Sequence, residues 1–145
     1  MIIPDTTIIS ELTRRVPEPR VLSWLDSLPA GETGTTAVTA AELLYGAARM
    51  PAGRRTTELA AAVRGLLGDE FRDRVLPFDE RCASRYADIA GGRDTLGRPI
   101  GAADAQIAAI CRTAEATLAT RNTDDFSGTG IELINPWTLD RPEPA

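Results

Sequence analysis

Short apolar stretches that alternate with longer helical patterns constrain the fold of this chain more than any other feature. Each β-branched or aliphatic run is followed by a segment whose apolar residues recur at helical spacing. Strands joined by helices pair in parallel through right-handed crossovers, so the alternation predicts a layered α/β fold. Parallel sheets of this kind bind ligands beyond the carboxyl ends of their strands, and we expect a functional site at that edge.

The predicted elements follow one another along the chain. Strands are expected at residues 1–4, 33–39, 74–78, 116–120 and 131–135. Helices are expected at residues 6–16, 20–28, 40–50, 54–68, 80–95 and 102–114. Thr39 is the expected N-cap of the third helix, and Gly68 is the expected C-cap of the fourth.

The length of the chain favours one domain, because 145 residues suffice for one buried core and are few for two. We expect residues 1–137 to form this domain and the proline-rich residues 138–145 to form a frayed tail. No apolar run approaches the ~18 residues that cross a bilayer, and a signal peptide is not evident, so a cytoplasmic location is expected. Cys82 and Cys111 are expected to be small core residues in a reducing compartment.

The chain contains no histidine. This absence excludes Ser-His-Asp and Cys-His nucleophiles, histidine bases and the usual zinc sites. Carboxylate chemistry remains, and it suits hard cations such as magnesium or manganese. The formal net charge of −5 argues against a broad nucleic-acid surface, although an acidic pocket attracts phosphate once it is loaded with cations. All 16 basic residues are arginine, which suits phosphate, but a GC-rich genome produces the same bias.

Acidic residues recur on one edge of the predicted sheet, after its strands or in the first turns of the helices that start there. They are Asp5, Glu42, Asp104 and the pair Asp124 and Asp125, which follows Asn122. Carboxylates that converge at one edge repel one another and raise each other's pKa unless a cation neutralises them. The pattern therefore predicts a divalent metal ion.

Each of these acids also has a purely structural explanation. Thr39 and Glu42 fit a capping box, in which Glu42 only reaches back to the amide of Thr39. Asp104 complements a helix dipole, Asp5 is a common cap after a strand, and the acids at 124–125 fit a solvated turn. These separate explanations do not predict that all the acids meet at one edge.

Five segments of the sequence carry a family resemblance. In chain order they are MII-DT--ISEL, T-AELLYGAARMPAGRR, LPFDE, GRPIGAADAQIAAI and ATLATRNTDDFSGTGIELINPW. From residue 1 to residue 137 the chain resembles the PIN-domain ribonucleases, in particular the VapC-type toxins of bacterial toxin–antitoxin pairs. The resemblance implies a three-layer α/β/α domain with a central, mainly parallel sheet. It also implies an endoribonuclease that depends on Mg²⁺ or Mn²⁺.

The resemblance implies roles for individual residues. Asp5, Glu42 and Asp104 match the three core acids of the family. Asp5 and Asp104 are implied metal ligands, while Glu42 orients metal or water from its helix. Thr6 and Thr120 are implied hydrogen-bond donors that fix the carboxylate rotamers.

The fourth acidic position departs from the family pattern. There the family has threonine, any residue, then Asp or Asn, with an aromatic residue four positions later, and Thr120, Asn122 and Phe126 occupy these places. Asn122 carries no charge, so Asp125 is the nearest ionised candidate for a catalytic metal ligand, and the choice between the two stays open. Thr7 stands where the family usually has Asn, and we expect its hydroxyl to donate or accept one hydrogen bond but not both.

The resemblance further implies partners. These are an RNA substrate, a second copy of the chain in a homodimer, and a small antitoxin that covers the active cleft with an arginine in the acidic pocket. The alternative from another class is a catalytically weak PIN-like module that binds a protein or nucleic acid without cleaving it. Thr7 and Asn122 are the features that favour this alternative.

Overall fold

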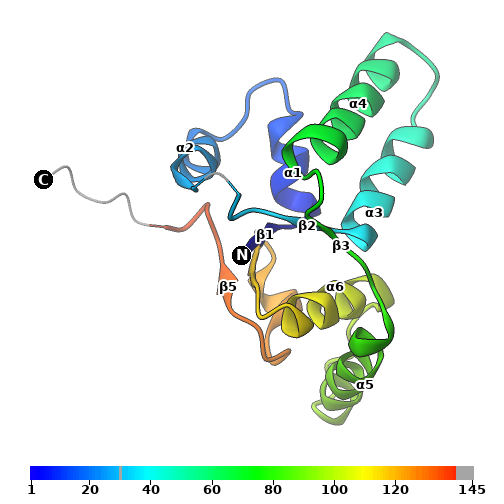
Figure 1. Ribbon diagram of the computed structural model, residues 1–145, viewed down its shortest axis with the longest axis vertical. Helices are drawn as coiled ribbons and strands as arrows, with labels where there is room; N and C mark the ends of the chain where they lie inside the picture. Colours follow the sequence, from blue (N-terminus) through cyan, green and yellow to red (C-terminus); the bar gives the residue numbers. More distant parts are fainter. Residues whose placement is uncertain (30, 140–145) are drawn as a thin grey trace, which may run out of the picture.

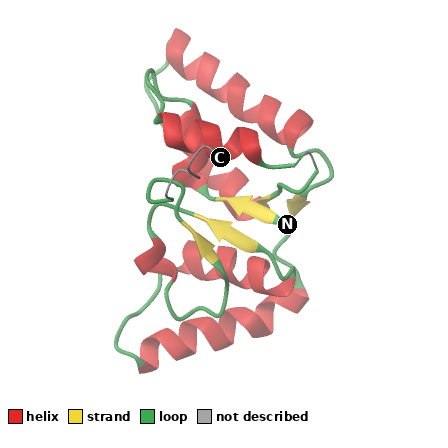
Figure 2. Ribbon diagram, turned by 90° about the vertical axis from the view of Figure 1, so that its left-hand side faces the viewer, coloured by secondary structure: helices red, strands yellow, loops and turns green. Residues whose placement is uncertain are grey.

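A parallel sheet lies between two layers of helices (Figure 1, Figure 2) in the computed structural model, which describes residues 1–29 and 31–139. The strands are β1 (Ile2–Pro4), β2 (Thr35–Thr36), β3 (Val75–Leu76), β4 (Thr117–Ala119) and β5 (Leu133–Ile134). The helices are α1 (Thr6–Leu12), α2 (Pro19–Ser27), α3 (Ala37–Ala48), α4 (Arg54–Gly65), η1 (Leu66–Glu70), α5 (Glu80–Thr95), α6 (Ala102–Thr113) and η2 (Thr123–Phe126). This arrangement confirms the predicted three-layer α/β/α fold.

The sheet has two ladders that meet at β1. β1, β4 and β5 pair in parallel, as do β2 and β3, and an isolated parallel bridge between Ile2 and Thr33 joins the two sets. On the β2 side, the amide of Ile2 donates to the carbonyl of Glu32 at 2.8 Å, and its carbonyl accepts from Gly34 at 3.0 Å. Pro4 is the next residue of β1 on that side and has no N–H, so the ladder between β1 and β2 stops there.

The helical layers bury separate parts of the core. α5 and α6 cover one face of the sheet, and α1 to α4 cover the other (Figure 1, Figure 2). Ile3, Ile107 and Leu118 belong to the cluster under α5 and α6, whereas Ile9 and Leu43 belong to a cluster among α1, α3 and α4. The short strands are thus held by helices packed on both faces, as a parallel sheet requires.

The two cysteines are buried free thiols, which confirms the predicted core role of Cys82 and Cys111. Burial raises the pKa of the Cys111 thiol to about 12, so this thiol stays protonated and inert near neutral pH. No helix within residues 1–29 and 31–139 combines the length and apolarity needed to cross a membrane. Of the predicted frayed tail, residues 140–145 lie outside the described residues.

The predicted boundary between the second strand and its helix was wrong. α3 begins at Ala37, and its N-cap is Thr36, whose hydroxyl accepts from the amide of Thr39 at 2.9 Å. The predicted N-cap Thr39 therefore lies inside the first turn. A cap three residues earlier lets the helix start directly after the two-residue strand β2.

Two predicted helix ends were also wrong. α1 ends at Leu12, so Val16 lies outside it, exposed to solvent. α4 continues past Gly65 as the wider turn η1, which passes through Gly68 instead of stopping there. Leu66 and Leu67 pack on the cluster around Ile9, and this burial outweighs the tendency of glycine to end a helix.

Candidate active site

Asp5 lies directly after β1 and caps α1. Its Oδ1 accepts hydrogen bonds from the amides of Thr7 at 2.9 Å and Ile8 at 3.4 Å, and from the Thr7 hydroxyl. The side chain is buried, with the residue only 5% exposed. Burial raises the pKa of the carboxyl, against hydrogen bonds from Thr120, Thr7 and Ile8 that lower it. The structural explanation of Asp5 as a cap is therefore correct, and the cap lies at the carboxyl edge of the sheet.

Thr7 holds Asp5 more firmly than the sequence suggested. Its hydroxyl donates to Oδ1 of Asp5 and accepts from the backbone amide of Arg121 at 3.2 Å. The prediction that this hydroxyl makes only one of the two bonds was wrong, because a hydroxyl proton and a lone pair can be used at once. Thr7 thereby connects the ends of β1 and β4.

Glu42 lies in the second turn of α3 and points toward α1. Its Oε1 accepts a hydrogen bond from the Thr6 hydroxyl at 3.0 Å. The capping box with Thr39 is wrong, because the amide of Thr39 is bound by Thr36. Glu42 is thus linked to the residue next to Asp5, as the predicted supporting role of Thr6 requires.

The pKa of Asp104 depends on the charges of the other acids. It lies half-buried in the first turn of α6, with a pKa raised by burial and then by the charges of Glu42, Asp125 and Asp5. The charge of Arg93 opposes this rise. Carboxylates from α3, η2 and the end of β1 therefore all act on Asp104 of α6 at one edge of the sheet.

The fourth position lies on the short helix η2. Asn122 immediately precedes η2, and the backbone amide of Asn122 donates to the Thr120 hydroxyl at 3.0 Å. Asp125 is exposed within η2, and its backbone amide donates to the carbonyl of Asn122 at 3.1 Å. The charge of Asp125 raises the pKa of Asp104, whereas Asp124, also exposed on the same turn, is not among the charges that do so.

Arg93 is a residue of this edge that the sequence analysis missed. It is 5% exposed, and its guanidinium donates to the carbonyls of Arg98 at 2.6 Å, Asp125 at 2.8 Å and Ser127 at 3.0 Å. These bonds join the end of α5 to η2 and hold the backbone that carries Asp125. No spacing or motif in a single sequence distinguishes this arginine from the fifteen others.

The donor set of the site suits a hard divalent cation. The side chains are carboxylates with neutral oxygen neighbours, and their mutual repulsion is what a bound cation relieves. Within residues 1–29 and 31–139, however, no three acidic or cysteine side chains are close enough together to hold a metal ion. The carboxylates share one edge and one electrostatic field without forming a preassembled metal centre.

A groove begins beside Glu42 and runs between α1, α3 and α4. Its volume is about 450 Å³, and Thr6, Glu42, Tyr45 and Arg49 are among the residues that line it. Leu43, Leu59 and Val63 form its apolar wall. The acidic edge therefore opens into a groove lined by both apolar and polar side chains.

Comparisons with known proteins show the family of the chain. Residues 2–131 match the PIN domain family. The chain is 40% identical to the VapC ribonuclease Y4jK of Sinorhizobium fredii over 94% of its length and 98% of that protein. It is 39% identical to the toxin FitB of Neisseria gonorrhoeae over 94% of its length and 99% of that protein. The structure of FitAB bound to an IR36 DNA fragment contains a chain with a TM-score of 0.91 and 38% identity, covering 98% of this chain and 99% of that one.

Proposed function

Because the chain belongs to the PIN domain family, we propose that it is the toxin of a toxin–antitoxin pair and cleaves RNA as an endoribonuclease. Relatives named as a ribonuclease and as a toxin, each matched over nearly its whole length, support both parts of the proposal. The observation that carries it is the meeting of Asp5, Glu42, Asp104 and Asp125 at the carboxyl edge of the sheet, where burial and then the charges of the other three acids raise the pKa of Asp104. A divalent cation bound at this edge would favour the charged form of the Asp104 carboxyl.

In this proposal Asp5, Asp104 and Asp125 would hold Mg²⁺ or Mn²⁺. When bound, the cation supplies a water of lowered pKa and neutralises charge on the phosphate oxygens. Thr7 keeps the Asp5 carboxylate in its rotamer, and Thr6 does the same for Glu42. Glu42 then orients the attacking water. Since the chain has no histidine, protons move through carboxylates and solvent.

We also propose that a second protein, an antitoxin, covers the groove beside Glu42. The relative FitB is named as a toxin, and the related solved structure is of FitAB, a complex bound to DNA. An antitoxin arginine placed against the acids would relieve the same repulsion that a metal ion relieves. A homodimer stays a prediction.

The alternative function is a PIN domain that binds RNA or protein without cutting. Two observations favour it: Asn122 supplies no charge at the fourth position, and the described residues hold no preassembled group of three metal-binding side chains. A purified protein that binds Mn²⁺ but leaves RNA intact at excess enzyme would establish this alternative.

Controlled expression in a bacterial host tests the proposed function. We expect the native protein to arrest growth and the Asp104→Asn variant, produced at the same level, to be tolerated. Sequencing of RNA 5′ ends from the arrested cells should reveal new cleavage sites that the variant lacks. Equal growth arrest by both proteins would contradict a role for the acids.

A further inference from the structure

One face of α3 presents an acid, an aromatic ring and a cation in succession. Glu42, Tyr45 and Arg49 are spaced three and then four residues apart, so they lie on one side of the helix. All three line the groove that begins at the acidic edge. Tyr45 is 66% exposed, and the Arg49 guanidinium lies 5.6 Å from the centre of its ring. The ring of Tyr45 is therefore accessible to a ligand in the groove.

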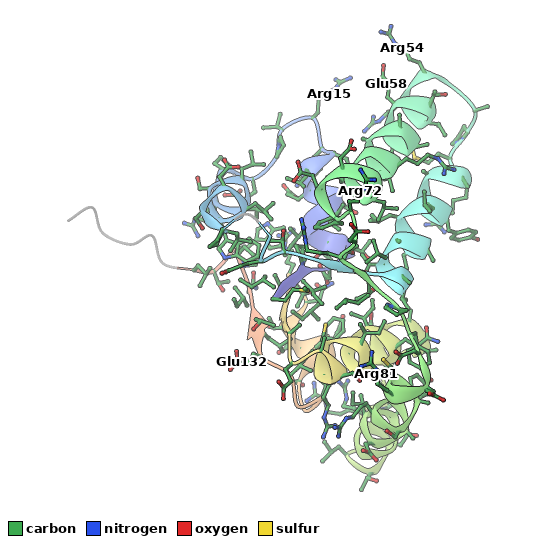
Figure 3. All side chains as sticks on the ribbon, in the orientation of Figure 1. Arg15, Arg54, Glu58, Arg72, Arg81 and Glu132 are labelled. Carbon is green, nitrogen blue, oxygen red and sulfur yellow. The ribbon has the colours of Figure 1, made fainter. Side chains whose placement is uncertain are left out.

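The groove continues into a second hollow that is rich in arginine. Thr13 and Leu59 line both, so the two cavities are contiguous. The second has a volume of about 770 Å³ and is lined by Arg15, Arg54 and Arg55. Figure 3 shows Arg15 and Arg54 at the end of the helical layer far from the sheet, with Glu58 beside Arg54.

The charge of this surface runs against the charge of the whole protein. The chain has a formal net charge of −5, yet Arg15, Arg49, Arg54 and Arg55 line the two hollows. Glu58, which pairs with Arg54 at 3.0 Å, is the acid among the residues lining the second hollow. An excess of cations that starts two helical turns beyond Glu42 favours a polyanion that reaches the acidic edge.

We propose that these residues form a track for single-stranded RNA, which passes from the acids at Glu42 over Tyr45 and Arg49 to Arg15 and Arg55. The inference rests on the proposed function and names how its substrate is held. Tyr45 offers a stacking surface to a base of any sequence, and the arginines contact phosphates. Arg49 lies about 10 Å along the helix from Glu42, since each residue of an α-helix rises ~1.5 Å. The track therefore holds nucleotides on one side of the scissile bond.

RNA binding by a cleavage-deficient protein tests the track. In an Asp104→Asn background with Mn²⁺, the fluorescence anisotropy of a labelled single-stranded RNA of about 12 nucleotides is titrated at several salt concentrations. Tyr45→Ala, Arg49→Ala and Arg55→Ala are compared with Arg85→Ala as the matched control. Arg85 is an exposed arginine on α5, which covers the opposite face of the sheet.

Each variant has a distinct expected result. Arg49→Ala and Arg55→Ala should weaken binding and each reduce the slope of log affinity against log salt by ~0.7, the value for one phosphate on a single strand. Tyr45→Ala should weaken binding about tenfold with the slope unchanged, because stacking does not release counterions. Arg85→Ala should behave as the background protein.

Three outcomes would overturn the inference. The first is an Arg85→Ala effect equal to that of Arg49→Ala. The second is unchanged affinity in all the track variants. The third uses polyglutamate of matched charge as a second probe. If the arginine variants lose as much affinity for polyglutamate as for RNA, and Tyr45→Ala has no effect, the surface binds an acidic protein instead. Cleavage by the protein with Asp104 intact is measured separately, so absence of cleavage removes the proposed nuclease function and leaves the binding result interpretable.

Discussion

The hydroxyl of Thr6 donates a 3.0 Å hydrogen bond to Oε1 of Glu42 and joins the first residue of α1 to the second turn of α3. The contact spans 36 residues of sequence. Because Thr6 follows Asp5, the same short segment positions two of the proposed catalytic acids. Asp5 and Glu42 are thus positioned relative to each other by the first turn of α1 and by the hydrogen bond from Thr6.

Removal of this bond should slow catalysis more than it weakens RNA binding. Thr6→Val keeps the shape of the side chain and deletes the donor, and a lost hydrogen bond of ~1 kcal/mol corresponds to roughly a fivefold lower kcat. KM should change little, because Glu42 is proposed to act on the attacking water. Thr6→Ser keeps the hydroxyl and should retain near-native kcat. Steady-state kinetics in which Thr6→Val matches the native enzyme would show that Glu42 needs no support.

The stability of the metal-free protein should depend on the acids in a specific direction. The pKa values of Asp5 and Asp104 are raised in the folded state above the ordinary 3.8, so these carboxyls stabilise the fold when protonated. That stabilisation is complete below pH 3.8 and is lost as pH rises through the higher folded pKa values. In Asp104→Asn the side chain at position 104 carries no charge at any pH, so this variant should avoid the part of the stability loss that is due to Asp104.

Thermal melts in chelator measure this effect. Asp104→Asn should melt roughly 3 °C above the native protein at pH 7, and the difference should shrink as pH falls toward 4. The comparison between the two proteins cancels the other titrating groups, such as Glu11, whose pKa is lowered because hydrogen bonds from Glu18 and Arg14 outweigh its burial. A lower melting temperature for Asp104→Asn at pH 7 would mean that burial and the neighbouring charges do not destabilise the charged form of Asp104.

Substitution of Asp125 and of its neighbour Asp124 tests which residue contacts the metal ion at the fourth acidic position. Asp125→Ala should lower Mn²⁺ affinity and activity, but by less than Asp5→Asn, because Asp125 contributes one exposed carboxylate to the shared field. Asp124→Ala removes the same charge one residue away and should have little effect. Calorimetric Mn²⁺ titrations check both variants. If Asp125→Ala titrates as the native protein does, Asn122 is the remaining contact at this position.

Arg93 should support the same turn through the backbone. Arg93→Leu would leave three partly buried carbonyls without their charged donor, and we expect it to lower the free energy of unfolding by roughly 1–3 kcal/mol. It should also weaken Mn²⁺ binding, because η2 would no longer hold Asp125. Arg112→Leu, near the end of α6, serves as the control in urea denaturation. Native-like Mn²⁺ affinity in a folded Arg93→Leu protein would limit Arg93 to a stabilising role.

The sequence predicted those parts of the fold that depend on local periodicity. The strand at β1, the helix α5 and the parallel arrangement follow from apolar spacing and alternation, and the structure confirms them. The start of α3 did not follow, because Thr36 and Thr39 are both good cap residues and only the tertiary position of β2 selects between them. Gly68 failed as a helix end for a similar reason, since burial of Leu66 overrides its local preference.

The sequence predicted which acids form the candidate site, but it did not predict the hydrogen bonds that hold them. Asp5 and Asp104 lie at the ends of predictable elements, so their shared edge follows from the fold class. The bonds from Thr6 to Glu42 and from Arg93 to the carbonyl of Asp125 join segments far apart in the chain. Such contacts depend on how helices pack on the sheet, which periodicity does not specify.

Cleavage of a labelled RNA by the purified protein, before and after addition of excess chelator, shows whether the acids at the carboxyl edge of the sheet hold a divalent cation for hydrolysis of RNA. We predict cleavage with Mn²⁺ or Mg²⁺, complete loss in chelator, recovery when Mn²⁺ is restored, and no cleavage by Asp5→Asn or Asp104→Asn under any of these conditions. Cleavage that persists unchanged in excess chelator, or in either variant, would contradict the account.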